Sequence, residues 1–190
     1  TDYLEIIELQ KSEHAPLVPT FTISANTIGW RVYIFYGNNK LVRTQHIHAP
    51  LADVWNFFSN PANLAKITPG YMNFRVTSET YTGSIYAGQV ITYKVSPIAG
   101  IPLSWMTEIT HVAPLRMFVD EQRHGPYKMW RHQHFFEEQG DTVLMTDIVH
   151  YKLPLGFLGS VAHNLFIKKQ LDDIFNFRRK VIDETFPDGK

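Results

Sequence analysis

Residues 127–153 read YKMWRHQHFFEEQGDTVLMTDIVHYKL, and this stretch restricts the fold more than any other part of the chain. Its two halves are rich in aromatic residues, valine, isoleucine and threonine, which favour strands. The dipeptide Gln139-Gly140 separates the halves and is typical of a hairpin turn. We therefore expect antiparallel strands over Tyr127–Glu137 and Asp141–Leu153.

Further strands are expected before this hairpin. In the clearest of them, polar residues separate Met72, Phe74 and Val76, a period of two that buries one face. The predicted strands are Lys40–His48, Met72–Thr77, Gln89–Ser96, Leu103–Ile109 and Arg116–Arg123. Two short helices are expected after the first strand, beginning at Pro50 and at Asn60-Pro61. Short turns between the later strands predict an antiparallel meander.

A long C-terminal helix is predicted over residues 159–185, after Pro154 and Gly156 interrupt the last strand. Its inner stripe has helical spacing and consists of Ile167, Leu171, Ile174, Phe175, Arg178 and Ile182. This helix is the only large element available to cover the apolar face of the sheet. The predicted fold class is α+β, a curved antiparallel sheet of about seven strands wrapped around this helix.

The sequence is divided into three parts. Residues 1–39 are expected to be an N-terminal extension, with a helix over Asp2–Lys11 and strands over Thr20–Ser24 and Trp30–Tyr36. Residues 40–186 are expected to form the ligand-binding domain, and residues 187–190 a tail.

Composition excludes several classes of function. The formal net charge is zero, which gives no global attraction to nucleic acid. The chain has no cysteine, so disulfides and thiolate catalysis are excluded. No apolar run is long enough to span a membrane, and we expect a cytoplasmic protein. No phosphate-binding glycine loop or serine nucleophile motif is present, and no cofactor is predicted.

The order of elements from residue 40 to residue 185 resembles the SRPBCC helix-grip superfamily of START-related, birch-pollen-allergen-like and polyketide cyclase domains. The segments that carry the resemblance to a bacterial ligand-binding branch are residues 54–58, 63–64, 67–69, 118–122, 125–127, 130–135, 147 and 151–154. The resemblance implies a helix-grip fold. It leaves function open, because carriers, receptors and enzymes share this scaffold.

Three consecutive strands carry polar residues on the face that we predict to be inner. If the turn after Arg123 has odd length, this face holds Phe118, Asp120, Gln122, Trp130, His132 and His134. The more charged set then faces solvent, which favours this register. A turn at Gln139-Gly140 places His132 directly opposite Asp147. A buried carboxylate needs a partner, so we expect His132 and Asp147 to form a hydrogen bond.

Four interpretations of this polar set are open. It is a buried structural network, the polar end of a ligand cavity, a catalytic acid–base pair of His132 and Asp147, or a metal site. A metal site would use His132 and His134, with Asp120 or Asp147 supplying oxygen. Two histidines on one strand are weak evidence for a metal, and we predict none. Arg178 either extends its head to water or meets an acidic group of a ligand.

The sequence predicts non-catalytic binding or transport of a small hydrophobic ligand, such as a lipid, sterol, polyketide or aromatic compound. The predicted ligand-binding residues are Phe74, Tyr93, Trp105, Thr107, Phe118, Asp120, Gln122, Trp130, His132, His134, Asp147, Tyr151, Leu171, Ile174, Phe175 and Arg178. An enzyme of the cyclase or aromatase type, which would use His132 and Asp147, is the alternative. A protein-interaction module, such as a chaperone activator, is the second alternative. The sequence does not predict an oligomeric state.

Overall fold

The computed structural model describes residues 39–78, 83–98, 100–154 and 160–188. The elements predicted within residues 1–38 lie outside these residues, as does most of the glycine-containing segment before the last helix. The described elements are β1 (Asn39–Ile47), α1 (Leu51–Phe58), η2 (Pro61–Asn63), η3 (Gly70–Met72), β2 (Arg75–Val76), β3 (Val90–Ile98), β4 (Ile101–Ala113), β5 (Met117–His124), β6 (Met129–Gln139), β7 (Thr142–Lys152) and α2 (Ser160–Thr185). No helix among them is long and apolar enough to cross a membrane.

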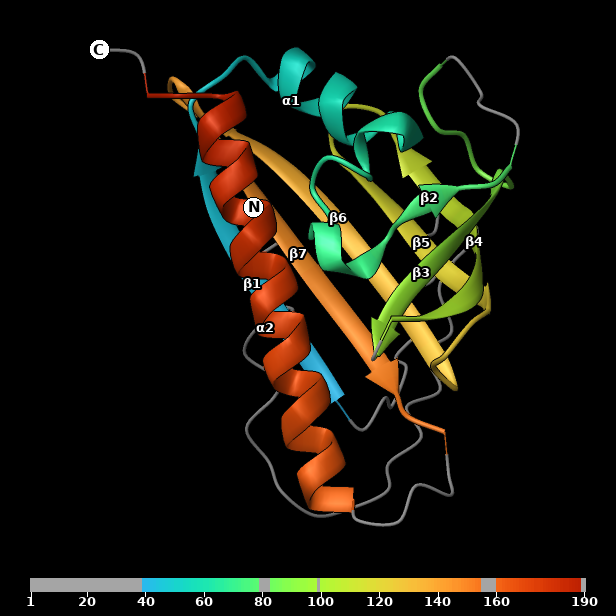
Figure 1. The fold of residues 1–190 in the computed structure, drawn as a ribbon. Coiled ribbons are helices and arrows are strands. Elements are labelled where there is room, and N and C mark those ends of the chain that lie inside the picture. Colours follow the sequence, from blue (N-terminus) through green and yellow to red (C-terminus); the bar gives the residue numbers. More distant parts are fainter. Residues whose placement is uncertain (1–38, 79–82, 99, 155–159, 189–190) are drawn as a thin grey trace, which may run out of the picture. The chain divides into compact units, whose positions relative to one another are not determined.

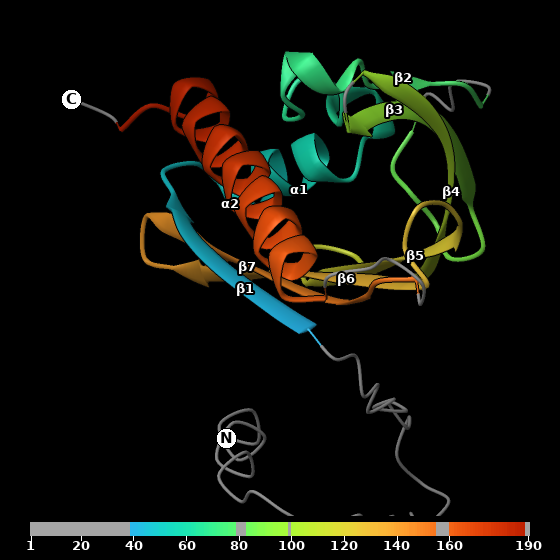
Figure 2. The same ribbon diagram turned by 60° about the horizontal axis from the view of Figure 1, so that its bottom comes forward.

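The strands form one antiparallel sheet in the order β1-β7-β6-β5-β4-β3-β2. Strands β2 to β7 follow one another as a meander, and β1 returns to pair with β7. The sheet curves strongly, so that β2 and β3 turn back over the side on which α2 lies (Figure 2). This arrangement confirms the predicted helix-grip fold, with the short helix α1 and the 3₁₀ turns η2 and η3 between β1 and β2 (Figure 1).

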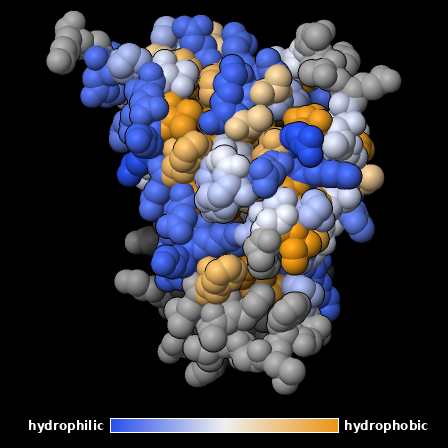
Figure 3. Space-filling model, in the orientation of Figure 1, coloured by the Kyte–Doolittle hydropathy of each residue, from blue (hydrophilic) through white to orange (hydrophobic). Residues whose placement is uncertain are grey.

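Helix α2 lies along the concave side of the sheet, next to β1 and β7 (Figure 1). The buried members of its inner stripe are Ile167, Leu171, Phe175 and Ile182. Several polar contacts tie the helix to β1; in two of them Arg43 forms an ion pair with Asp172, and Gln45 Nε2 donates to Asp183 Oδ1 at 2.7 Å. Hydrophilic side chains cover much of the outer side of the helix (Figure 3).

Strand β2 is shorter than the sequence predicts. The alternating segment Met72–Thr77 contains only the two strand residues Arg75 and Val76, which pair with β3. The residues before them form the 3₁₀ turn η3, which ends at Asn73 in the left-handed conformation with a φ of 46°. An alternating pattern also fits a segment that packs one face without pairing, so periodicity alone overstated the strand.

The β6–β7 hairpin also differs from the predicted register. The turn is the two-residue loop Gly140-Asp141, with Gly140 at a φ of 65°, and Gln139 pairs with Thr142. His134 rather than His132 therefore lies directly opposite Asp147, and the prediction that His132 does so is wrong. The shift is two residues, and an even shift leaves every side chain on its predicted face.

Candidate ligand cavity

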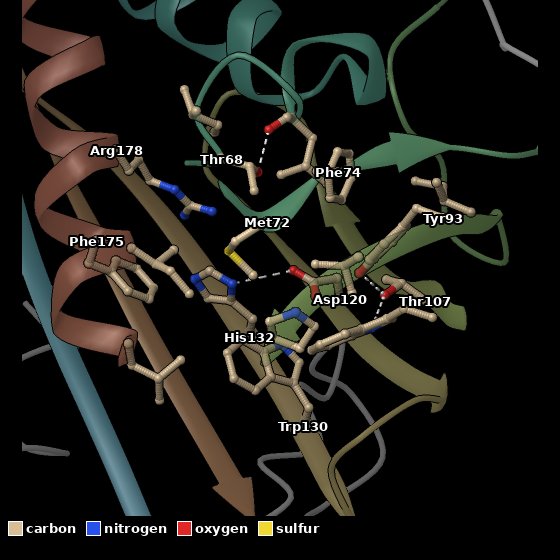
Figure 4. Close-up of a pocket in the computed structure, with 18 of the residues that line it drawn as sticks. Thr68, Met72, Phe74, Tyr93, Thr107, Asp120, Trp130, His132, Phe175 and Arg178 are labelled. Atoms are coloured by element: carbon tan, nitrogen blue, oxygen red, sulfur yellow. Dashed lines mark hydrogen bonds and ion pairs between the residues drawn. The ribbon is translucent and has the colours of Figure 1, made fainter. Parts of the chain in front are cut away.

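A cavity of about 610 Å³ lies between the curved sheet, the short helices and α2. Its walls are mostly aromatic and aliphatic, and they come from the segment between Phe57 and Phe74, from β3 to β6, and from the inner face of α2. Figure 4 shows side chains from these three sources facing a common space. A pocket of this size with few polar groups is the usual form of a small-molecule site.

Tyrosine and tryptophan side chains form one wall of the cavity. The rings of Tyr93 and Trp105 are stacked with centroids 5.8 Å apart, and Trp105 meets Trp130 edge-on at 5.6 Å. The polar atoms of this wall are satisfied at Thr107, whose hydroxyl lies 2.8 Å from the Tyr93 hydroxyl and accepts from Trp105 Nε1 at 3.1 Å. Burial raises the pKa of the Tyr93 hydroxyl far above its ordinary value, so this wall carries no charge.

A cluster of two imidazoles and two carboxylates lies at the base of the cavity on β5, β6 and β7. His132 Nε2 donates to Asp147 Oδ1 at 2.8 Å, and His134 Nε2 donates to Asp120 Oδ2 at 2.9 Å. A carboxylate only accepts, so both Nε2 atoms carry hydrogen. His134 Nδ1 also lies 2.8 Å from Asp147 Oδ1, but the geometry is too bent for a hydrogen bond. The expected bond between His132 and Asp147 is thus present despite the altered register.

The pKa values of the two rings in this cluster are shifted in opposite directions. Burial, followed by the charge of His134, lowers the pKa of His132 below its ordinary value. Burial also opposes the charge on His134, but the hydrogen bond to Asp120 and the contact with Asp147 outweigh it and raise the pKa of that ring. Burial alone would raise the pKa of Asp147, yet the two imidazoles hold it well below its ordinary value. Near neutral pH, Asp147 is therefore ionised and His132 is neutral, and His134 holds its proton more strongly than His132 does.

Arg178 reaches from α2 toward this cluster, beside Phe175 (Figure 4). Its Nη1 atom lies 3.7 Å from Asp147 Oδ2, which is ion-pair range but too far for a hydrogen bond. The guanidinium carbon lies 5.0 Å from the centroid of the Phe175 ring. The side chain is only 12% exposed, which does not fit an arginine whose head extends to water.

The sequence of this chain matches the model of a known protein family. Residues 47–176 match the family described as polyketide cyclase / dehydrase and lipid transport. The chain belongs to this family. The match runs from the end of β1 into α2 and confirms the resemblance that the sequence motifs indicate.

Solved structures share the fold of this polyketide cyclase / dehydrase and lipid transport domain. Ms6760 from Mycobacterium smegmatis is 17% identical with a TM-score of 0.55, over 77% of this chain and 89% of that one. The major latex-like protein 151 from Panax ginseng is 16% identical with a TM-score of 0.56, over 78% and 97%. A protein from Arthrobacter aurescens is 13% identical with a TM-score of 0.59, over 76% and 86%. At these identities the similarity is one of fold alone. A comparison with curated proteins finds no match.

In this member of the family, the predicted ligand-binding residues line the cavity, with three exceptions. Gln122 instead bonds to the backbone of Tyr127, donating to its carbonyl at 2.7 Å and accepting from its amide at 3.3 Å. Tyr151 is buried against the rings of Tyr127 and Trp130. Asp147 lies behind His132 and borders a smaller hollow of about 30 Å³.

The part of the cavity wall that the short helices supply is not among the predicted ligand-binding residues. Its lining residues between α1 and β2 include Phe57, Phe58, Leu64, Ile67, Thr68 and Met72. Their spacing is that of any helix face packed on a core, which is how Trp55 on the same helix does pack, against Phe118 and Phe136. The order of elements does indicate this wall, because short helices that lie between the first strand and the rest of a curved sheet have to cover the open side of that sheet.

The same cluster contains donor atoms that could hold a metal ion. Asp120, His132 and His134 each offer one ligand atom, and these atoms lie within 4.8 Å of one another. Such a set suits a divalent transition metal, with Asp147 orienting the imidazoles from behind. Binding would require breaking the hydrogen bond between His134 and Asp120, and the two imidazole rings are tilted against each other with centroids only 3.8 Å apart. The donors are therefore arranged as a bonded network rather than as an open coordination sphere.

Proposed function

We propose that this domain binds one molecule of a small hydrophobic compound in the cavity and carries it without chemical change. The observation that supports this function is the cavity itself, about 610 Å³ of mostly apolar space within a single domain. Ligand pockets of about 300–1,000 Å³ commonly enclose most of a small molecule. A lipid, sterol, polyketide or aromatic compound fits such walls, and the description of the family includes lipid transport.

Native mass spectrometry of freshly purified protein tests this function most directly. We expect a mass above that of the chain, and release of one apolar compound on denaturation. A melting-temperature screen with fatty acids, sterols and flavonoids follows. A ligand at about a hundred times its dissociation constant adds roughly 2.7 kcal/mol to the free energy of unfolding. If the native mass equals that of the chain and no compound shifts the melting temperature, the proposed function is wrong.

Acid–base catalysis by His132 is the second candidate, because this residue lines the cavity. The neutral ring donates from Nε2 to Asp147, which leaves Nδ1 with a lone pair, 3.7 Å from Asp120 Oδ2. An imidazole held in one tautomer by a buried carboxylate is suited to act as a general base. Mass spectrometry of an added linear poly-β-ketone tests this. Loss of water in the presence of the protein, abolished in His132→Gln, would favour the enzyme over the carrier.

The chaperone-activator alternative has no comparable support. A docking module needs a contiguous exposed apolar patch. Among the described residues, the exposed large hydrophobic side chains are spread over several elements: Val42, Tyr71, Tyr86, Val90, Ile101, Met106, Leu115 and Phe166. Because these side chains are spread over several elements, we do not propose a protein-interaction function for this domain.

A further inference from the structure

Arg178 gives the cavity a permanent positive charge. It is the only lysine or arginine among the described residues that line the cavity. A guanidinium is a charged group in proteins, and that of Arg178 lies along an apolar wall with Phe175 beneath it. A cation in such a place costs free energy unless an acceptor or an anion compensates it.

Neither carboxylate of the cluster accepts a hydrogen bond from Arg178. Asp120 accepts from His134, and Asp147 accepts from His132, so each already has an imidazole donor. Asp147 approaches Arg178 only to 3.7 Å. The Nε and Nη1 atoms of Arg178 are buried and make no hydrogen bond within the described residues. These donors are left for an acceptor that enters the cavity (Figure 4).

The geometry points to a ligand that is itself amphipathic. We propose that the cavity binds an apolar molecule ending in a carboxylate, and that Arg178 binds this carboxylate. A guanidinium matches a carboxylate in shape and charge, and it holds one through short charge-assisted hydrogen bonds. The aromatic and aliphatic walls take the rest of the ligand. This inference rests on the proposed binding function and specifies its ligand class.

One competing arrangement involves water. Arg178 also borders the small hollow of about 30 Å³, together with Thr44, Gln45 and Asp147. That space is large enough for one ordered water molecule, which would accept from the guanidinium. A water in that place would satisfy the donors without any ligand. The cavity would then have no preference for an acid over a neutral compound of the same shape.

Two pairs of probes separate these arrangements. Dodecanoate is compared with 1-dodecanol, and 2-naphthoate with 2-naphthalenemethanol, all below their aggregation limits at pH 7.5. Each compound displaces the neutral fluorophore N-phenyl-1-naphthylamine from the protein. The aliphatic and aromatic pairs distinguish a fatty acid from an aromatic acid as the source of the carboxylate. We expect the acid of at least one pair to bind about ten- to a hundredfold more tightly than its alcohol.

Variants of Arg178 test whether this residue causes the preference for the acid over the alcohol. Arg178→Met should bring the affinity for the acid to within about threefold of the affinity for its alcohol. Arg179→Met is the matched control, because Arg179 is exposed on the adjacent position of α2, does not line the cavity and donates to the Thr44 carbonyl. It should keep the full preference. Arg178→Gln is a second neutral variant in case the methionine variant does not fold.

The outcomes are distinct. Equal affinities for acid and alcohol in the wild-type protein would overturn the proposal and leave the binding function intact. A preference that persists in both Arg178 variants would also overturn it. Failure of the fluorophore and of all four probes to bind would instead remove the proposed function on which the inference rests.

Discussion

Replacement of Asp147 should destabilise the domain more than that of any exposed acidic residue. Asp147 is 6% exposed, bonds to His132 at 2.8 Å and lies 2.8 Å from His134 Nδ1 and 3.7 Å from Arg178. A hydrogen bond to a charged group contributes roughly 1.5–3 kcal/mol, and breaking a buried charged pair costs roughly 3–5 kcal/mol. We therefore expect Asp147→Ala to lower the free energy of unfolding by about 3–5 kcal/mol.

Asp147→Asn should have a smaller effect. The amide oxygen can still accept from His132, while the charge that stabilises His134 is lost. A decrease of about 1–2 kcal/mol is expected, in the range for a single weakened buried hydrogen bond. Urea unfolding at pH 7, followed by tryptophan fluorescence, measures both changes. For a domain of this size, each kcal/mol lowers the melting temperature by roughly 2–4 °C, which gives a second readout.

Asp141→Asn is the matched control for this pair. Asp141 is an exposed carboxylate in the turn of the same hairpin, and its replacement should change the free energy of unfolding by less than about 0.5 kcal/mol. The reasoning is refuted if Asp147→Ala costs less than about 1 kcal/mol. It is also refuted if Asp147→Asn is as harmful as the alanine variant.

Two further predictions concern the cluster and the cavity. In a pH titration followed by imidazole ¹⁵N NMR, His134 should stay charged above its ordinary pKa and His132 should stay neutral below it. The raised pKa of His134 contributes stability that is complete below about pH 6.5 and is lost as the pH rises through the pKa of the folded protein. The difference in free energy of unfolding between wild type and His134→Gln should therefore shrink toward high pH. Both rings titrating together near pH 6.5 would contradict the assignment. Ile174→Trp, which fills the cavity from α2, should weaken binding of N-phenyl-1-naphthylamine at least about tenfold with little change in melting temperature. Phe177→Trp on the same helix does not face the cavity and is the control, and equal affinities in the two variants would disprove the assignment.

Most of the fold follows from two periodicities in the sequence. Alternation predicts which side chains share a face, and helical spacing predicts the inner stripe of α2 from Ile167 to Ile182. Neither depends on knowing where a turn is centred. This explains how the hydrogen bond between His132 and Asp147 was predicted from a register that is wrong by two residues.

The remaining features depend on three-dimensional packing. The length of β2 depends on where the chain leaves the sheet, and Asn73 in a left-handed conformation fixes that point. The position of the Arg178 head depends on the depth at which α2 lies on the sheet. Spacing places Arg178 on the inner stripe, but it does not reveal that both carboxylates of the cluster already accept from imidazoles.

The pairing of β1 with β7 has a consequence for the synthesis of the protein. Strands β2 to β7 each pair with a strand that is next to them in sequence. Strand β1 instead pairs with β7, the last strand in sequence, so that Arg43 lies opposite Asp147. On the ribosome, β1 emerges before the other described strands, and its partner β7 emerges last among them. Until β7 follows, it does not cover the edge of β1, which a strand of another nascent chain could then join. The basic residues Lys40 and Arg43 along β1 oppose such pairing between two identical strands, because like charges on adjacent strands repel.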